Sequence, residues 1–285
     1  MGQMREKMLA KMKTCGVAEN TQRTYMSAMK MYVRHYNQSP EKLSVEEIQK
    51  YHLYLIEERK LCAASVNVHM GAIKFFYQMC LKKEFQYGDI PKLKEIKKVP
   101  IVLSQEEICK LLGVITNIKH KALVAMLYAS GLRSFEALEL KAEDILSDRM
   151  LIYVRRGKGG KNRYTLLSHA LLKLLRQYWV ENKNDKSQWL FPGQAATEPM
   201  SYSGLRTVFQ KAKKKAGLTT KASVHNLRHS FATHLLEMGT DIRIIQDLLG
   251  HATLNSTMIY TRVARTRLSD IRNPLDAINE KVNLI

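Results

Sequence analysis

Apolar side chains in the first third of the chain recur every three or four residues, the spacing of one helix face. Asn20 and Thr21 are suited to cap a first such segment, and Ser44 with Glu47 has the sequence of a capping box before a second. A third begins at Ser65. Their apolar positions are Tyr25, Met29, Tyr32, Val33 and Tyr36, then Val45, Ile48, Leu55 and Ile56, then Val66, Ile73, Phe76, Tyr77 and Cys80. The pattern predicts a small bundle of about four helices with the aromatic stripe in its core.

Residues 88–100 interrupt this periodicity. Pro91 and Pro100 bracket the stretch, and helix is disfavoured directly before each proline. The lysines inside it are Lys92, Lys94, Lys97 and Lys98. We therefore expect a helical domain over residues 1–87, a basic linker over 88–100 that lies along DNA or is simply solvated, and a second domain over 101–285.

The pattern in the second domain mixes helical periods with one pair of strands. Ser104 and Glu107 form another capping box, and a helix through 121–130 is predicted to end at Gly131. Residues 150–156 and 162–167 read as strands on either side of a glycine-rich turn. Further helices are predicted over 169–181, 203–216 and 225–238, and a last one between Asp241 and Gly250. The expected fold class is mainly α with a small β-sheet.

Charge adds the first indication of function. Lys and Arg number 46 against 26 Asp and Glu in 285 residues, which gives a formal net charge of +20. Residues 1–100 carry +8 of it and residues 101–285 carry +12. Two basic domains favour a polyanionic partner, nucleic acid above all. Composition alone leaves open a ribosome-associated or merely basic soluble protein.

The same sequence argues for a protein of the reducing cytoplasm. It shows no signal peptide and no apolar stretch of about 18 residues that would span a membrane. Its four cysteines are scattered, with no spacing typical of disulfide frameworks or zinc sites: Cys15, Cys62, Cys80 and Cys109.

Four places in the second domain carry candidate chemistry. They are Arg133 with Glu136, Lys158 in the glycine-rich turn, His225 with Arg228, and His251 nine residues before Tyr260. Each has an ordinary structural explanation alone, and spacing does not distinguish Tyr260 from Tyr153, Tyr164 or Tyr202. Together they supply cations, a nucleophile, a base and an acid, which metal-free phosphoryl transfer requires. His225 and His229 have the spacing of a protease zinc pair, but the glutamate between them is missing.

Four sequence blocks resemble tyrosine recombinases of the Xer and integron-integrase type. They are GLRSFEAL, GKGGKNR, HNLRHSFATHLLEMGTDIRIIQDLLGH and STMIYTRV, in the family's order and spacing. The resemblance covers about 101–262. Residues 20–85 are similar, more loosely, to the family's helical core-binding (SAM-like) domain. The fold implied is that domain followed by a tyrosine-recombinase catalytic domain.

The resemblance also implies a role for each candidate residue. Tyr260 would form a 3′-phosphotyrosyl link, and Arg133 and Arg228 would hold the non-bridging oxygens. Lys158 would protonate the leaving 5′ oxygen. His225 would accept the tyrosine proton, His251 would donate to the phosphate, and Glu136 would orient the cations. No metal, ATP or other cofactor is implied.

The expected partner is double-stranded DNA, bound by a homotetramer or together with a partner recombinase, without a membrane. The family exchanges strands through a Holliday junction, and residues 264–285 are suited either to pack into a neighbouring protomer or to fold back. Lys211, Lys213, Lys214 and Lys215 are expected to touch phosphates. The expected location is cytoplasmic and nucleoid-associated. Target sequence and biological role, whether mobile-element integration, excision or dimer resolution, stay open.

Two alternative functions share this scaffold. A type IB topoisomerase uses the same tyrosine chemistry as a monomer, but small topoisomerases generally lack the GLRxxE pattern combined with LLGH. A catalytically inactive DNA-binding or architectural protein would have lost at least one catalytic residue. Here all six positions are filled, which favours an active enzyme.

Overall fold

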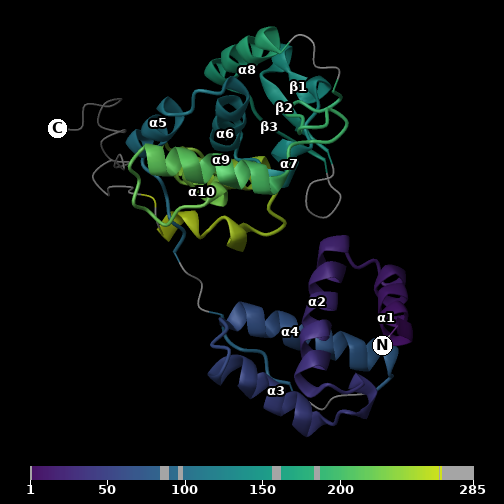
Figure 1. Ribbon diagram of the computed structural model, residues 1–285. Coiled ribbons are helices and arrows are strands. Elements are labelled where there is room, and N and C mark those ends of the chain that lie inside the picture. Colours follow the sequence, from purple (N-terminus) through teal and green to yellow (C-terminus); the bar gives the residue numbers. More distant parts are fainter. Residues whose placement is uncertain are drawn as a thin grey trace, which may run out of the picture. The chain divides into compact units, whose positions relative to one another are not determined.

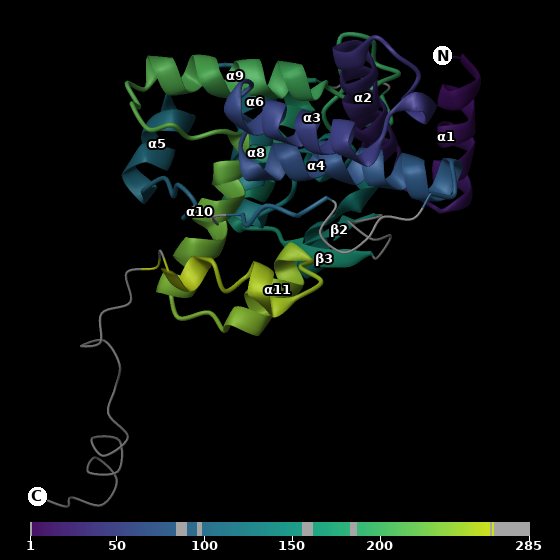
Figure 2. The ribbon, with the colours of Figure 1, turned by 90° about the horizontal axis from the view of Figure 1, so that it is seen from below.

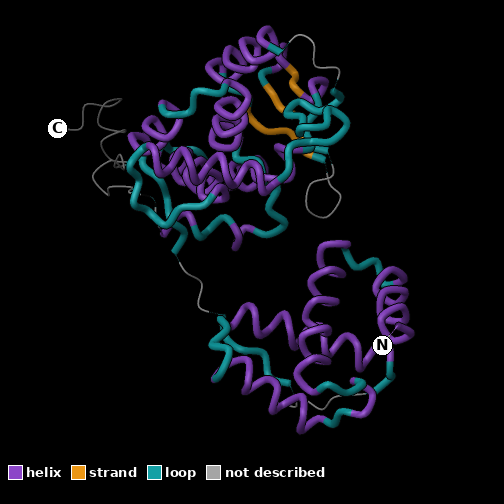
Figure 3. The backbone as a smooth tube through the Cα atoms, viewed as in Figure 1, coloured by secondary structure: helices purple, strands orange, loops and turns teal. Residues whose placement is uncertain are grey.

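Helices dominate the computed structural model, which describes residues 2–83, 90–95, 99–155, 162–182, 187–262 and 264 (Figure 1). One small sheet accompanies them, so the predicted fold class is confirmed (Figure 3). The chain divides into two compact units, Met1–Lys98 and Val99–Ile285. The assignment of 88–100 as a linker stays a prediction. Among the described helices, none is both long and apolar enough to cross a membrane.

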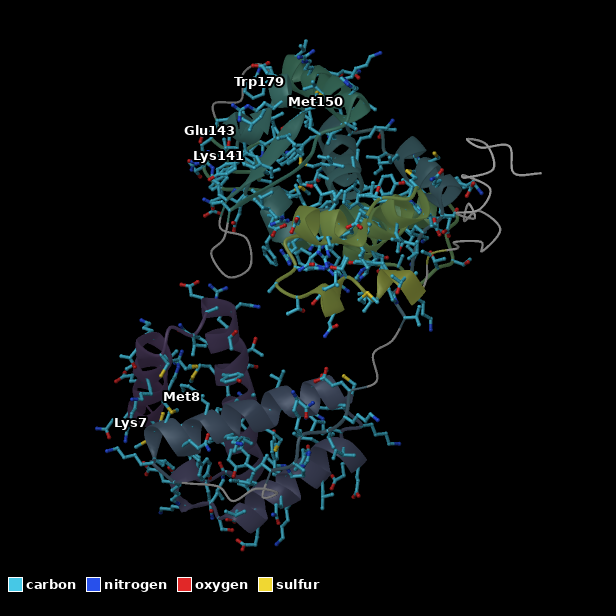
Figure 4. All side chains as sticks on the ribbon, turned by 180° about the vertical axis from the view of Figure 1, so that it is seen from behind. Lys7, Met8, Lys141, Glu143, Met150 and Trp179 are labelled. Atoms are coloured by element: carbon cyan, nitrogen blue, oxygen red, sulfur yellow. The ribbon has the colours of Figure 1, made fainter. Side chains whose placement is uncertain are left out.

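The first unit is a helical bundle. Its helices are α1 (Gly2–Thr14), α2 (Glu19–Tyr36), α3 (Val45–Glu57) and α4 (Ala63–Phe75), the last extended by a π-helical turn over Phe76–Cys80. Their buried faces form one core that includes the predicted aromatic stripe. The alternation is plain on α1, where Lys7 is exposed and Met8 is buried (Figure 4).

Two predicted helix starts in this unit were wrong by a few residues. α2 begins at Glu19 after Ala18, which provides no side-chain cap, and not after Asn20 and Thr21. α4 begins at Ala63 and not at Ser65. Packing of the apolar face, rather than a capping side chain, therefore fixes where these helices start. The capping box at Ser44 is present as predicted.

A short extended stretch packs against α4. The side-chain amide of Asn67 donates to the carbonyl oxygen of Leu93 at 3.0 Å, and the amide of Leu93 donates back to Asn67 at 2.9 Å. Two bonds from one side chain hold the backbone of residues 90–95 on this unit. Lys92 and Lys94 point into solvent from this stretch, whereas Lys97 and Lys98 lie outside the described residues.

The second unit is built around α6 (Ile118–Ser130). None of its residues is exposed, so it is a core helix rather than an amphipathic one. The helices around it include α5 (Gln105–Gly113), α8 (His169–Glu181), α9 (Tyr202–Lys215) and α10 (Val224–Glu237), as Figures 1 and 2 show. The remaining helices are α7 (Ser134–Leu138) and α11 (Ile242–Leu249).

A three-stranded antiparallel sheet packs beside this helical core. Its strands, in spatial order, are β1 (Ile145–Leu146), β2 (Leu151–Val154) and β3 (Arg163–Leu166). β2 and β3 are the predicted pair, and β1 was too short to recognise from its sequence. Val154 pairs with Arg163, which places that arginine at the first position of β3. The turn between them, with Lys158, lies outside the described residues.

Left-handed glycines end two helices that lead to the candidate site, as predicted. Gly131 follows α6 with φ +62°, and Gly250 follows α11 with φ +61°. A Cβ atom on Gly131 would lie 2.3 Å from Cδ1 of Phe231. The position therefore requires glycine both for its backbone angle and for space.

We expect Gly131→Ala to lower the free energy of unfolding by about 2 to 4 kcal/mol, through backbone strain and the clash with Phe231. The matched control is Gly217→Ala, after α9, which has φ +67° but nothing within 4 Å of a new Cβ. Strain alone should lower its stability by about 1 kcal/mol. Urea unfolding followed by circular dichroism measures both, and equal losses would contradict the packing argument.

Candidate active site

A single carboxylate, Glu136 in α7, gathers three arginines. Arg163 meets it with both terminal nitrogens, Nη1 at 2.9 Å and Nη2 at 2.7 Å from the two carboxylate oxygens. Arg133 donates to it from its backbone amide and from Nη1, each at 2.8 Å. Nη1 of Arg228 lies 3.9 Å away. One carboxylate thus fixes three guanidinium groups from α10, β3 and the start of α7.

The same arginines bind the carboxyl end of α11. Each donates to one of three successive carbonyl oxygens: Arg163 to Leu248 at 3.0 Å, Arg228 to Leu249 at 2.6 Å and Arg133 to Gly250 at 3.4 Å. These are carbonyls that the helix itself leaves unpaired, at the negative end of its dipole. Arg228 also donates to the carbonyl of Gly131, at the end of α6.

Burial and neighbouring charges set the ionisation of this cluster. Burial alone would raise the pKa of Glu136, but the bonds and charge of Arg163, with those of Arg133, lower that pKa to about 2. The side chain of Arg228 is only 2% exposed, and burial followed by the charge of Arg133 lowers its pKa to about 10. Three cations against one carboxylate leave a net positive charge that complements an anion.

Tyr260 lies against this cluster and is 1% exposed. Its hydroxyl lies 3.2 Å from Nδ1 of His229, in the middle of α10. The ring of His251 stacks on the tyrosine ring, and its Nδ1 lies 2.9 Å from Oγ1 of Thr257. Burial raises the pKa of the Tyr260 phenol, and the charges of Arg228 and Arg133 act in the opposite direction.

Three neutral imidazoles lie in this site: His229 and His251 contact the tyrosine ring, and His225 contacts His229. Burial, followed by neighbouring positive charge, lowers the pKa of His225. Burial lowers the pKa of His229 and of His251 to about 4, again reinforced by neighbours that include Arg228. The rings of His225 and His229 meet edge to face at 4.7 Å. A neutral imidazole has one donor and one acceptor nitrogen, so each ring can both donate and accept a hydrogen bond at pH 7.

Most of the predicted residues therefore meet in one place in the second unit. Arg133, Glu136, Arg228, His225, His251 and Tyr260 lie together, and Lys158 lies outside the described residues. Sequence reasoning missed Arg163 and treated His229 only as a failed zinc ligand. The sequence did contain a signal for His229: it lies four residues after His225, and this spacing places both side chains on one face of a helix. The described ranges contain no group of three His, Cys, Asp or Glu residues suited to a metal.

The predicted lysines of α9 lie near its carboxyl end. Lys211, Lys214 and Lys215 are exposed, whereas Lys213 is half-buried. Three of the four are thus available for contacts with phosphate.

Comparison with known proteins places this chain in a family. Residues 102–267 match the model described as "Phage integrase family", and residues 4–87 match "Phage integrase, N-terminal SAM-like domain". A putative integrase/recombinase of Sinorhizobium fredii is 37% identical over 98% of this chain and 90% of its own length. The tyrosine recombinase XerD of Oceanobacillus iheyensis is 30% identical over 90% of this chain and 92% of its own.

Solved structures share the fold. XerH recombinase bound to its difH substrate superposes with a TM-score of 0.70 at 24% identity, covering 95% of this chain and 83% of that one. A lambda integrase dimer bound to a core site gives 0.73 at 20% identity, over 96% and 99%. The fold and sequence define a tyrosine site-specific recombinase, an enzyme. The chain belongs to the phage integrase family.

We expect Glu136→Gln to lower the free energy of unfolding at pH 7 by about 3 kcal/mol, because it leaves buried guanidinium groups without their counter-charge. The pKa of Glu136 is about 2 when folded against an ordinary 4.5. Its contribution is therefore complete above that ordinary value and is lost as the pH falls towards 2. The difference in free energy of unfolding between wild type and Glu136→Gln should therefore decrease by about 2 kcal/mol from pH 7 to pH 3.

Urea unfolding at both pH values measures that gap. Glu143→Gln is the matched control, since Glu143 pairs with Arg155 at the surface with 62% of its side chain exposed. The free energy of unfolding of Glu143→Gln should lie within about 0.5 kcal/mol of the wild-type value at either pH. A gap for Glu136→Gln that does not change with pH would refute the assigned pKa.

Proposed function

We propose that this recombinase cleaves and rejoins double-stranded DNA through Tyr260. Oη of Tyr260 attacks the scissile phosphorus and forms a 3′-phosphotyrosyl bond, while the bond from phosphorus to the 5′ oxygen breaks. Lys158 supplies the proton that leaves with the 5′-hydroxyl. A 5′-hydroxyl from the partner strand then attacks the phosphotyrosine and releases Tyr260. Because the intermediate retains the phosphodiester bond energy, the exchange needs no ATP.

The observation that carries this proposal is the convergence on Tyr260 of neutral imidazoles and buried cations. Its hydroxyl lies 3.2 Å from His229, and Arg228 and Arg133 are close enough to lower its pKa against the effect of burial. In the proposed reaction Arg133 and Arg228 hold the non-bridging oxygens, and Glu136 orients both. Removing one such donor from a buried site typically slows chemistry by about 10² to 10³.

The route of the tyrosine proton follows the hydrogen bond. We assign His229 as the first acceptor, in place of His225, because Nδ1 of His229 lies 3.2 Å from the hydroxyl and accepts its proton when the imidazole carries its own proton on Nε2. His225, one turn earlier, then acts beside the phosphate with His251, which donates to a non-bridging oxygen. The pKa of His229 is about 4, so the ring is in its accepting form throughout the physiological range.

DNA is the proposed partner for the rest of the molecule as well. The net charge of +20, the exposed lysines Lys92 and Lys94, and those of α9 all favour contact with phosphates. We propose further phosphate contacts by Lys97 and Lys98. The solved XerH and lambda integrase structures are DNA complexes of those proteins. We propose a homotetramer, in the cytoplasm at the nucleoid, that exchanges strands through a Holliday junction.

The first test asks for the covalent bond at Tyr260. The protein is incubated with sheared genomic DNA of its host, and DNA that stays attached after denaturation is sequenced to recover the site. A nicked duplex of that sequence then traps the adduct, visible by denaturing electrophoresis. Wild type should give an adduct with a blocked 3′ end and a free 5′-hydroxyl. Tyr260→Phe should bind the duplex equally well and give none.

Tyr164→Phe is the matched control, because it removes one hydroxyl from a tyrosine that is 49% exposed in the same unit. Its adduct should form at the wild-type rate. An adduct that persists in Tyr260→Phe would assign the nucleophile elsewhere. No adduct from wild type on any recovered DNA would favour an inactive DNA-binding protein.

A second test separates the two histidines. His229→Gln keeps a hydrogen-bonding group but cannot take up a proton, so single-turnover cleavage should slow by about 10²-fold or more with unchanged DNA affinity. His225→Gln should slow it less. Between pH 6 and pH 8 the wild-type rate should show no titration of His229, whose pKa is about 4. The reverse order of the two variants would return the acceptor role to His225.

A further inference from the structure

Arg163 uses its whole guanidinium group inside the protein. Nη1 and Nη2 bind the two oxygens of Glu136, and Nε donates to the carbonyl of Leu248 at 3.0 Å. Its side chain is 10% exposed, against 25% for Arg133. Of the three arginines around Glu136, Arg163 alone grips both carboxylate oxygens through its two terminal nitrogens, the geometry that fixes the orientation of a carboxylate.

Arg163 also packs on the end of α11. A Cβ atom at Gly250 would lie 2.8 Å from Cδ and 3.0 Å from Nε of Arg163, so the side chain passes directly over this glycine. Gly250 immediately precedes His251 in the sequence. Arg163 thus contacts Leu248 and Gly250. The residue between them, Leu249, provides the carbonyl that accepts a hydrogen bond from Arg228. The side chain therefore ties the start of β3 to Glu136 and to the helix end that holds the other arginines.

The charges give this arrangement a consequence for phosphate binding. A carboxylate beside Arg133 and Arg228 competes with a phosphodiester for the same donors. With Arg163 in place, its Nη2 lies 2.7 Å from one carboxylate oxygen of Glu136, whereas Nη1 of Arg228 lies 3.9 Å from the same oxygen, beyond hydrogen-bond distance. Without Arg163, the partners left to the carboxylate in the described part of the chain are Arg133, which already donates to it, and Arg228, the two arginines proposed to bind phosphate.

We propose that Arg163 is a positioning residue for cleavage, which acts through Glu136 and the last carbonyls of α11 to hold Arg133 and Arg228 in position for the scissile phosphate. This inference rests on the proposed function of Tyr260. Arg163 does not itself touch the DNA in this role. Lysine at this position cannot reproduce a two-oxygen contact together with a third bond from Nε.

The test is single-turnover cleavage of the nicked duplex recovered by covalent capture. Arg163→Ala should slow adduct formation by about 10²-fold while the Kd for the duplex changes by less than about threefold, because chemistry rather than binding is affected. Arg163→Lys should recover part of the rate. Arg155→Ala is the matched control: Arg155 follows β2, pairs with Asp144 and Glu143, and touches neither Glu136 nor α11 in the bonds described.

A change of substrate distinguishes positioning from general damage to the fold. A methylphosphonate at the scissile position removes the negative charge that Arg133 and Arg228 must hold. On this neutral duplex the rates of wild type and Arg163→Ala should approach each other to within about fivefold, since less transition-state charge needs stabilising. An undiminished defect on the neutral duplex would mean a merely structural role and would overturn the proposal.

A double-mutant cycle tests the route through Glu136. If Arg163 acts through that carboxylate, Arg163→Ala combined with Glu136→Gln should be no slower than the slower single variant. If the rate defects of the two single variants multiply in the double variant, Arg163 does not act through Glu136. Should Arg163→Ala fail to fold, Arg163→Lys enters the same cycle. Failure of the wild type to form any Tyr260 adduct would instead refute the proposed function, so the two failures are distinguishable.

Discussion

The structure of the second unit depends on burying positive charge. Arg228 is almost inaccessible, and such a cation is stable only where it is paired and fully hydrogen-bonded. Glu136 supplies the opposite charge, but one carboxylate cannot neutralise three guanidinium groups. The helix ends supply the rest, because the carbonyls that end α6 and α11 accept the remaining donors. The cluster thus keeps a net positive charge without leaving any of its arginines without partners.

The fold is arranged to bring those helix ends together. No residue of α6 is exposed, so its direction is set by the core around it, and Gly131 turns the chain sharply at its end. The turn points the carbonyl of Gly131 at Arg228 and leads directly into Arg133 and α7. Gly250 does the same for α11 and leads into His251. Two left-handed glycines therefore fix, through helix packing, where the proposed catalytic groups lie.

Features that depend on neighbours in sequence could be predicted, and those that depend on distant partners could not. The capping boxes at Ser44 and Ser104 and the glycine at 131 were read correctly, because each uses residues within one turn. The start of α2 was misplaced because core packing overrode the local caps. Arg163 was missed because its partners, Glu136 and the end of α11, lie 27 and 85 residues away. Resemblance to a family supplied the set of site residues that periodicity alone could not select.

The burial of Tyr260 places a limit on how the proposed reaction can begin. Tyr260 and Arg228 are both nearly inaccessible, so a phosphate cannot reach both without local movement. Arg228 is held by two bonds of 2.6 Å to the helix-end carbonyls of Gly131 and Leu249. Tyr260 lies in a short 3₁₀ turn, joined to α10 by one side-chain bond to a neutral histidine. A local movement that opens this site must therefore precede the proposed attack, because the phosphate has to contact Tyr260 and Arg228 together.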